Sequence, residues 1–334
     1  MERVQRWKCL ACGRTFLDRP KFGDDVKARA IDAYCDGESS YRAVGRALGV
    51  KSDTVWSWVQ ERGGQCKTFA EVATELRPTW DGYVLADGRT VRIRGVKYAL
   101  CLTADEGTQD VPQAGLFAHE DYRAWQATFL ALKALAYPLK GLTLDDDPAL
   151  WAAATEVFPS APRQLCLVHV MRQMRRWLKY TARIPIVVHK PFLDLCQRLC
   201  YAVNHAHLAR LHAEWQTARP QYLREGLADA VAQFESKFPV LWTYLDYPGM
   251  PRTSNVIEAV IRQLGRKLDD TDGFQTPGTA WATIQLLLMR YRFHPFSCSR
   301  IQRHNGESPL NLAGVNTQEL DWVRFAQRLA RPPT

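Results

Sequence analysis

The chain has 334 residues, 46% of them hydrophobic, which is long enough for two or three domains with a sizeable core. Lysine and arginine number 44 against 35 aspartates and glutamates, and the net charge of +9 favours an acidic partner, with nucleic acid first. No apolar run reaches the roughly 18 residues of a membrane span, the start does not resemble a signal peptide, and nine scattered cysteines suggest no disulfide framework, so we expect a cytoplasmic protein.

The first segment, residues 1–22, contains a C-x-x-C knuckle in "RWKCLACGRTF". The thiolates of Cys9 and Cys12 at this spacing can bind one face of a tetrahedral zinc ion. A closed structural site needs four ligands, and the chain has no second C-x-x-C; Cys35 and Cys66 are the remaining candidates nearby. The segment is therefore either a zinc site or half of a ribbon without metal.

Residues 23–66 predict three short helices, with Gly49 at the turn before the last one and Ser52 or Asp53 as its cap. Helix, glycine turn and helix is the pattern of a helix-turn-helix, whose last helix enters the major groove of DNA. A plain three-helix bundle is the alternative. The side chains expected to face the groove are those of Lys51, Ser52, Thr54 and Ser57.

Residues 80–170 have the pattern of an α/β domain. Alternating and apolar runs predict strands at 82–95, 96–105, 111–119, 139–144 and 163–169, with helices at 120–136 and 147–158. Three strands in succession followed by alternating helix and strand indicate a mixed sheet.

Residues 171–334 are expected to be mostly helical, with helices at 210–216, 222–238, 252–268 and 279–293. Two stretches, 171–190 and 289–305, contain basic residues and no acidic ones. They are Arg172, Arg175, Arg176, Lys179, Arg183 and Lys190, and then Arg290, Arg292, Arg300 and Arg303. Such grouping favours a track for a polyanion over scattered solubilising charge.

Three consecutive aspartates follow the apolar run 142–144 in "GLTLDDDPALW". Like charges this close repel one another unless water or a cation receives them. Asp146 and Asp147 suit a helix start, since acids favour the helix N-terminus and Pro148 favours the first turn. Asp145, at the strand end, is the candidate functional residue.

Two more carboxylates stand out. Asp87 lies inside an apolar strand, where a charge needs a reason, unless Asp87-Gly88 is a hairpin turn. Glu258 shares a helical stripe with Asn255, Arg262 and Arg266, although a surface Glu-Arg pair is common. Carboxylates from separate elements could hold two Mg²⁺ or Mn²⁺ ions, which clamp the attacking and leaving oxygens of a phosphodiester.

From about residue 80 to the end, the chain resembles bacterial insertion-sequence transposases of the Mutator-like DDE group. The matching segments come in the family's order: "VLADG", "LTLDDDPAL", "FPSAPRQLCLVHVMRQM", "RTSNVIEAVIRQLGRK", and "DGFQT" followed by an apolar helix and "GESPLNLAG". No single motif is unique, but the ordered set is specific, and a knuckle with a helix-turn-helix is a common front end of such enzymes.

The resemblance implies an RNase H-like catalytic domain with a helical insertion. It would place the first part of the core at 80–170, the insertion at 171–250, and the last helices and tail at 251–334. Asp87, Asp145 and Glu258 would be the catalytic, metal-binding triad. Cys166 and His169 would form a C-x-x-H pair beside the active site, unless they are only a buried thiol and a hydrogen-bonded imidazole. Asn255 matches a position near the glutamate.

The resemblance also implies partners and a reaction. Element ends and target DNA would be bound, with Arg172, Arg175 and Arg176 opening the insertion along the DNA path and Arg262 and Arg266 beside the glutamate. Metal-activated water would cut one strand, the freed 3′-OH would attack target DNA, and pairing two ends would require at least a dimer. The alternatives are a DNA-binding regulator derived from an inactive transposase and a repair nuclease that cleaves without joining.

Overall fold

A five-stranded mixed sheet lies at the centre of the protein, with strand order β5-β4-β3-β6-β7. The computed structural model describes residues 6–11, 13, 15–17, 22–37, 39–181, 185–269, 271, 273–299 and 301–328. The strands are β3 (Tyr83–Ile93), β4 (Val96–Asp105), β5 (Gln113–Phe117), β6 (Gly141–Leu144) and β7 (Arg163–Leu165). β3, β6 and β7 run parallel, and β4 is antiparallel to both of its neighbours. The expectation of an α/β domain with a mixed sheet is confirmed.

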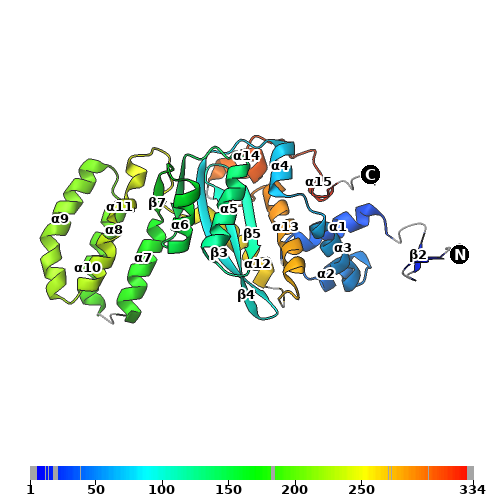
Figure 1. The fold of residues 1–334 in the computed structure, drawn as a ribbon, viewed down its shortest axis with the longest axis horizontal. Coiled ribbons are helices and arrows are strands. Elements are labelled where there is room, and N and C mark those ends of the chain that lie inside the picture. Colours follow the sequence, from blue (N-terminus) through cyan, green and yellow to red (C-terminus); the bar gives the residue numbers. More distant parts are fainter. Residues whose placement is uncertain are drawn as a thin grey trace.

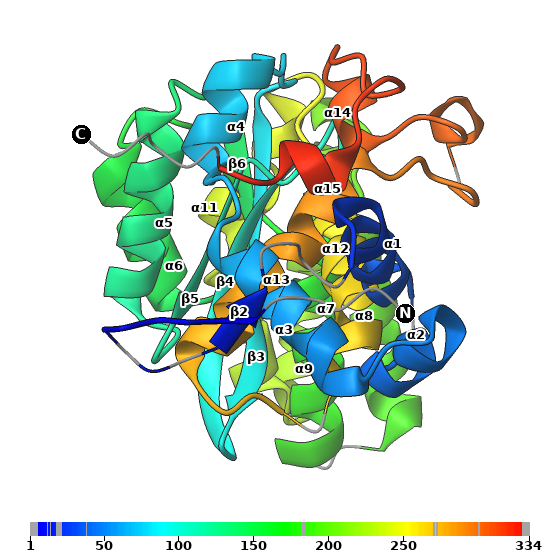
Figure 2. The same ribbon diagram turned by 90° about the vertical axis from the view of Figure 1, so that its right-hand side faces the viewer.

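Helices cover both faces of this sheet (Figures 1 and 2). α5 (Tyr122–Ala134) and α6 (Pro148–Val157) pack on one face, and α12 (Asn255–Asp269) and α13 (Pro277–Phe293) on the other. Alternate residues of β3 pack into the cores on opposite faces of the sheet. Val84 packs in one core with Trp125 of α5, whereas Leu85 packs in the other with Ile257 of α12. Because both faces of the strand are covered here, its first four residues, Tyr83–Ala86, are all apolar and buried.

The helices after β7 form an arm at one end of the long axis (Figure 1). They are α7 (Leu167–Arg176), a π-helical turn (Trp177–Thr181), α8 (Ile186–Cys200), α9 (His205–Arg224), α10 (Ala228–Glu235), α11 (Phe238–Leu241) and a 3-10 turn (Thr243–Leu245). Phe192, Trp215 and Phe234 are fully buried in a core of the arm that is separate from the two cores of the sheet domain and meets the sheet at Leu165 of β7.

Two expected elements were wrong. The strand expected at 163–169 ends at Leu165, because Leu167, Val170 and Met174 form a helical stripe and begin α7. The helix expected at 222–238 is divided between the end of α9 and α10. Gly226, with a φ of 83°, interrupts the helix between them.

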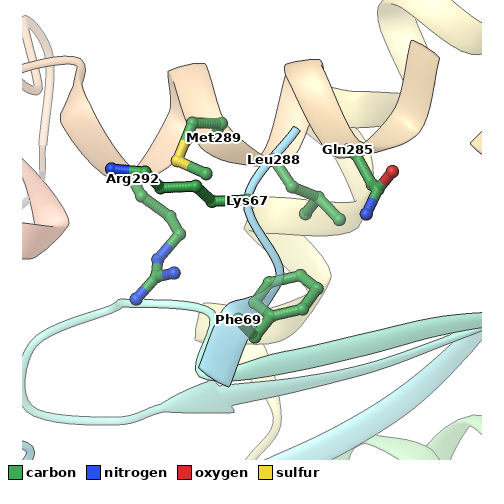
Figure 3. A pocket seen from close by; sticks show the side chains of 6 residues that line it. All are labelled: Lys67, Phe69, Gln285, Leu288, Met289 and Arg292. Atoms are coloured by element: carbon green, nitrogen blue, oxygen red, sulfur yellow. The ribbon is translucent and has the colours of Figure 1, made fainter. Parts of the chain in front are cut away.

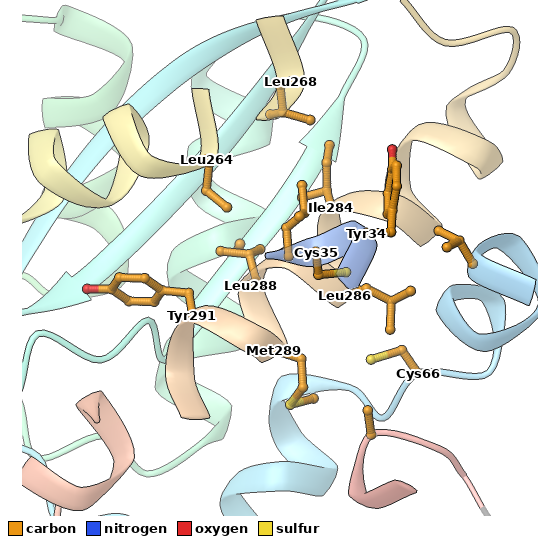
Figure 4. Packing of buried hydrophobic residues seen from close by; sticks show 14 of the residues in the cluster. Tyr34, Cys35, Cys66, Leu264, Leu268, Ile284, Leu286, Leu288, Met289 and Tyr291 are labelled. Atoms are coloured by element: carbon orange, nitrogen blue, oxygen red, sulfur yellow. The ribbon is translucent and has the colours of Figure 1, made fainter. Parts of the chain in front are cut away.

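The N-terminal helices share a core with the sheet domain rather than lying apart from it. They are α1 (Asp24–Cys35), α2 (Tyr41–Leu48), α3 (Ser52–Gly64) and α4 (Phe69–Leu76), preceded by the strands β1 (Arg6–Lys8) and β2 (Thr15–Leu17). Tyr34, Cys35 and Cys66 pack with Ile284 and Leu286 of α13 (Figure 4). The chain closes with a 3-10 turn (Gln302–His304), α14 (Pro309–Leu312) and α15 (Trp322–Phe325).

Two arginines of the second basic stretch, 289–305, are buried in this packing. The interpretation of the stretch as a polyanion track was therefore wrong for these two. Arg292 is 1% exposed and binds Asp110, with Nε to Oδ1 at 2.7 Å and Nη2 to Oδ2 at 2.8 Å. Arg290 is also buried and pairs with Asp36, the residue that caps the C-terminal end of α1, at 2.5 Å. Arg300, like Arg183 in the first stretch, lies outside the described residues. Within the described parts of the chain, no helix is both long and apolar enough to cross a membrane.

Candidate active site

Asp87 lies in the middle of β3, opposite Leu102 of β4, and the hairpin turns seven residues later at Arg94-Gly95. The hairpin-turn alternative for Asp87-Gly88 is therefore wrong. One carboxylate oxygen of Asp87 accepts a hydrogen bond from the backbone N–H of Gly88 at 2.8 Å. Burial raises the pKa of Asp87 to about 6, with Asp145 and Glu258 adding to the rise and His169 opposing it.

Asp145 is the first residue after β6, at the level of Asp87, because Ala86 pairs with Leu144. Its side chain accepts a hydrogen bond from the N–H of Asp146 at 2.6 Å, and its carbonyl accepts one from the indole of Trp151 at 2.7 Å. These bonds hold the strand end in place. Because β3 and β6 are parallel and Ala86 pairs with Leu144, the next residues along the two strands, Asp87 and Asp145, lie at neighbouring positions.

Asp146 and Asp147 were both expected to start the following helix, but only one of them does. Asp147 is the N-cap of α6 and accepts from the N–H of Leu150 at 2.9 Å, as expected for a helix start. Asp146 is not a helix-start residue: its carboxylate forms an ion pair with the buried Lys237 of the arm. Asp146 thus joins the arm to the sheet.

Glu258 lies one turn into α12, and His169 of α7 stands between it and Asp145. Nε2 of His169 is 3.5 Å from Oε1 of Glu258, and Nδ1 is 3.6 Å from Oδ1 of Asp145. Arg172, one turn further along α7, places Nη2 3.5 Å from Oε2 of Glu258. Two of the three acids expected from sequence, Asp145 and Glu258, therefore contact one imidazole, and Asp87 is near enough for its charge to raise the pKa of that imidazole. Glu258 is thus more than a surface Glu-Arg partner.

Cys166 and His169 belong to a small buried network with Ser254, which precedes α12. The thiol of Cys166 lies 3.1 Å from the Ser254 hydroxyl and accepts from the Ser254 N–H at 3.3 Å, and the same hydroxyl lies 3.4 Å from Nδ1 of His169. Burial raises the pKa of the Cys166 thiol, but hydrogen bonds from His169 and Ser254 outweigh it, and the pKa is lowered. The network fixes the imidazole between the acids.

The charge of His169 complements that of the carboxylates. Burial lowers its pKa, but the hydrogen bond to Cys166 and the negative charges of Cys166, Asp145 and Asp87 raise it to about 9. The imidazole is therefore cationic at neutral pH and offsets the repulsion among the acids.

The side chains of Asp87, Asp145 and Glu258 supply hard oxygen donors of the kind that Mg²⁺ and Mn²⁺ prefer. Oε1 of Glu258 is buried and makes no hydrogen bond, so it has the capacity for a further ligand. Among the described residues, no three Asp, Glu, His or Cys side chains are grouped to hold a metal ion as they stand. The three carboxylates are therefore of the chemical type that binds a divalent ion. In this structure the imidazole of His169 lies between two of them, Asp145 and Glu258.

The remaining candidate residues lie on three surfaces. Arg175 of α7 is exposed and donates to the Gln197 side chain at 3.1 Å, and Arg176 is also exposed. On α12, Asn255, Arg262 and Arg266 are exposed and Glu258 is half-buried. On α3, Lys51 and Ser57 are exposed, whereas Ser52 and Thr54 are partly buried.

The cysteines offer no complete zinc site among the residues that the structure describes. Cys12 lies outside them, and Cys9 is half-buried near β1. Cys35 and Cys66 are 6% and 2% exposed in the core around α13, where burial raises the pKa of each thiol to about 12. Thiols with such raised pKa values disfavour the thiolate that zinc requires.

Sequence reasoning missed three contributors to the site. Ser254 and Lys237 were not expected at the site, and Arg172 was expected only as a DNA contact. The small pocket between α4 and α13 contains none of the candidate residues (Figure 3). It is lined by Lys67, Phe69, Gln285, Leu288, Met289 and Arg292.

Comparisons with known proteins give a family. Among solved structures, the HTLV-2 integrase catalytic core domain in complex with magnesium matches with 12% identity, covering 38% of this chain and 88% of that one, at a TM-score of 0.24. The simian T-cell lymphotropic virus intasome in complex with a PP2A regulatory subunit matches with 10% identity over 53% and 69% of the two chains, at a TM-score of 0.23. No curated protein matches. The model of the Mutator family of transposases matches residues 29–293, and the chain therefore belongs to that family.

Proposed function

We propose that the protein is a DNA transposase in which Asp87, Asp145 and Glu258 hold divalent metal ions for strand cleavage and strand transfer. The observation that carries this proposal is the contact of Asp145 and Glu258 with one imidazole, beside Asp87 at the neighbouring position of the sheet. The central sheet with helices on both faces is consistent with the RNase H-like core that the resemblance implies. Two Mg²⁺ or Mn²⁺ ions would activate the attacking oxygen and stabilise the leaving one.

The chain's own residues prepare the site for these ions. Asp87 and Asp145 are fixed by backbone hydrogen bonds at adjacent strand positions, whereas Glu258 is on a helix and contacts His169 and Arg172. Asp87, Asp145 and Glu258 would hold the ions, and His169, which lies between Asp145 and Glu258, would have to give way to an ion bound by both. Arg172, 44% exposed, is placed to exchange Glu258 for a DNA phosphate.

DNA would be bound on two sides of this site. Exposed Arg172, Arg175 and Arg176 on α7 line the arm, with Arg262 and Arg266 on α12 beside it. We further propose that α2 and α3 act as a helix-turn-helix, since Gly49 has a φ of 66° at the turn between them. Lys51 and Ser57 would then reach the groove, with Ser52 and Thr54 near the helix start. Assembly of at least two protomers would pair the element ends in the bacterial cytoplasm.

Nicking of supercoiled plasmid in Mg²⁺ or Mn²⁺ tests the proposal. Asp87→Asn, Asp145→Asn and Glu258→Gln should each reduce nicking and joining by at least about a hundredfold, since each removes a ligand of the shared ions. Duplex binding should persist in all three. The matched control is Glu319→Gln, which neutralises an exposed acid far along the chain. Full nicking by any of the three site variants, or nicking in excess EDTA, would contradict the proposal.

A further inference from the structure

The hairpin of β3 and β4 extends beyond the rest of the sheet. β5 pairs with β4 only as far as Ala99, whereas β3 and β4 continue to pair as far as Ile93 and Val96. The last part of the hairpin is therefore a two-stranded ribbon, and it projects from the lower side of the molecule in both ribbon views (Figures 1 and 2).

The segment after α12 supports this ribbon. The N–H of Arg94 donates to the carbonyl of Phe274 at 2.8 Å, and the N–H of Phe274 donates to the carbonyl of Arg92 at 3.2 Å. Ile93 and Phe274 are 3% and 8% exposed, so the ribbon is joined to the core on this side. Its tip is thus a fixed projection and presents its side chains in a defined arrangement.

Three exposed cations occupy the tip: Arg92, Arg94 and Lys97. Arg92 stands directly opposite Lys97 in the strand register, so both side chains lie on one face, and like charges in this position destabilise a hairpin. Among the described residues, no carboxylate forms an ion pair with any of the three, and Asp269 is paired with Arg89 at 2.6 Å. Asp270 and Asp272 lie outside the described residues.

Arg94 adds a second cost to folding. Its φ is 49° and that of Gly95 is 78°, so both central residues of the turn are left-handed. Asparagine and glycine are the residues that adopt such a two-residue turn with little strain. An exposed arginine here, next to an opposed pair of cations, is unfavourable for the hairpin itself and favourable for binding an anion.

We infer that the tip of the β3–β4 hairpin binds the duplex DNA that flanks the cleaved bond, an inference that rests on the proposed function. The major groove of DNA admits a two-stranded ribbon, and cations at its tip can reach the phosphates on either side. Seven residues separate Asp87 from Arg94, about 23 Å at roughly 3.3 Å per residue. At about 3.4 Å per base pair, the contact falls about seven base pairs from the cut.

Salt-dependent binding tests this assignment. The full chain and the variant Arg92→Gln/Lys97→Gln are titrated against a fluorescent duplex of roughly 30 base pairs of mixed sequence, between about 50 and 200 mM salt. If both cations contact phosphates, the slope of log K against log salt becomes shallower by about 2. The matched control, Arg210→Gln/Arg224→Gln, removes two exposed charges from α9 and should change the slope by less than half of that amount.

A single substitution separates binding from folding. Arg94→Asn keeps a residue that favours the left-handed turn, so Tm should equal or exceed that of the wild type while duplex affinity falls several-fold. Loss of affinity together with a lower Tm would count against the inference.

Three further outcomes would overturn it. Equal slopes for the hairpin and control variants would do so and would leave the proposed function standing. Unchanged duplex binding with lost self-association would identify a second copy as the partner instead. A wild-type protein that binds no duplex would overturn the inference and the proposed function together.

Discussion

Asp87 is a half-buried carboxylate whose charge destabilises the fold. Its pKa is raised to about 6 from an ordinary value of 3.8, so the folded protein binds a proton more readily than the unfolded chain between these values. The charged side chain therefore destabilises the fold above pH 6, and this cost disappears as the pH falls toward 4. Such a cost is characteristic of functional sites.

The sign of this effect gives a prediction. In EDTA at about pH 8, Asp87→Asn should raise the free energy of unfolding by roughly 1–3 kcal/mol, because one pKa unit corresponds to about 1.4 kcal/mol. Near pH 4 the gain should vanish, since the wild-type carboxyl is then neutral in the folded state. Denaturant unfolding at the two pH values measures it. A variant less stable than the wild type at pH 8 would show that Asp87 supports the fold.

At this scale, sequence identified the acids but not their environment. Asp87 was found because a charge inside an apolar strand is unusual, and Asp145 because it ends a strand. The position of His169 between Asp145 and Glu258 depends on where α7 begins after β7, which an apolar run such as "RQLCLVH" does not reveal. Lys237 could not be found either, since its partner Asp146 is 91 positions away.

At the scale of elements, α3 and α13 pack with their backbones in close approach. A Cβ atom on Gly63 would lie 2.2 Å from the carbonyl oxygen of Ala282, and the neighbouring Gln60 donates to the Thr283 hydroxyl at 3.0 Å. Gly63 therefore allows the helix proposed to read DNA to pack directly on the last long helix of the sheet domain.

Two adjacent glycines of α3 make this contact testable. Gly63→Ala should lower the free energy of unfolding by about 1–3 kcal/mol through overpacking against the α13 backbone. Gly64→Ala is the matched control: a Cβ added at Gly64 would meet nothing within 4 Å, and alanine should stabilise the helix by about 0.5–1 kcal/mol. Thermal or denaturant unfolding distinguishes them. Equal effects of the two substitutions would mean that α3 does not pack on α13 as described.

The elements themselves were predicted unevenly from sequence. Strands and helices of the central domain followed from alternation and helical periodicity, and α12 followed from its amphipathic stripe. The buried roles of Arg290 and Arg292 did not, because an arginine that pairs with Asp36 or Asp110 looks in sequence like one that faces DNA. Only the distant partner decides between the two.

Over the whole molecule, the candidate site lies between the arm and the sheet domain. Asp87 and Asp145 come from the sheet, His169 and Arg172 from the first helix of the arm, and Glu258 from the helix that returns after it. The ion pair of Asp146 with Lys237 fixes the arm against the same strand end. The arm therefore contributes residues to the site, since His169 and Arg172 of its basic helix α7 contact the acids.

In the proposed function, Asp87, Asp145 and Glu258 bind the same divalent ions. Titration of the duplex-bound protein with Mn²⁺, followed by electron paramagnetic resonance of the free ion, tests it most directly. If the three acids share the ions, the wild type should bind about two, and each of Asp87→Asn, Asp145→Asn and Glu258→Gln should lose tight binding. Undiminished Mn²⁺ binding by the Glu258→Gln variant would contradict a site shared by the three acids.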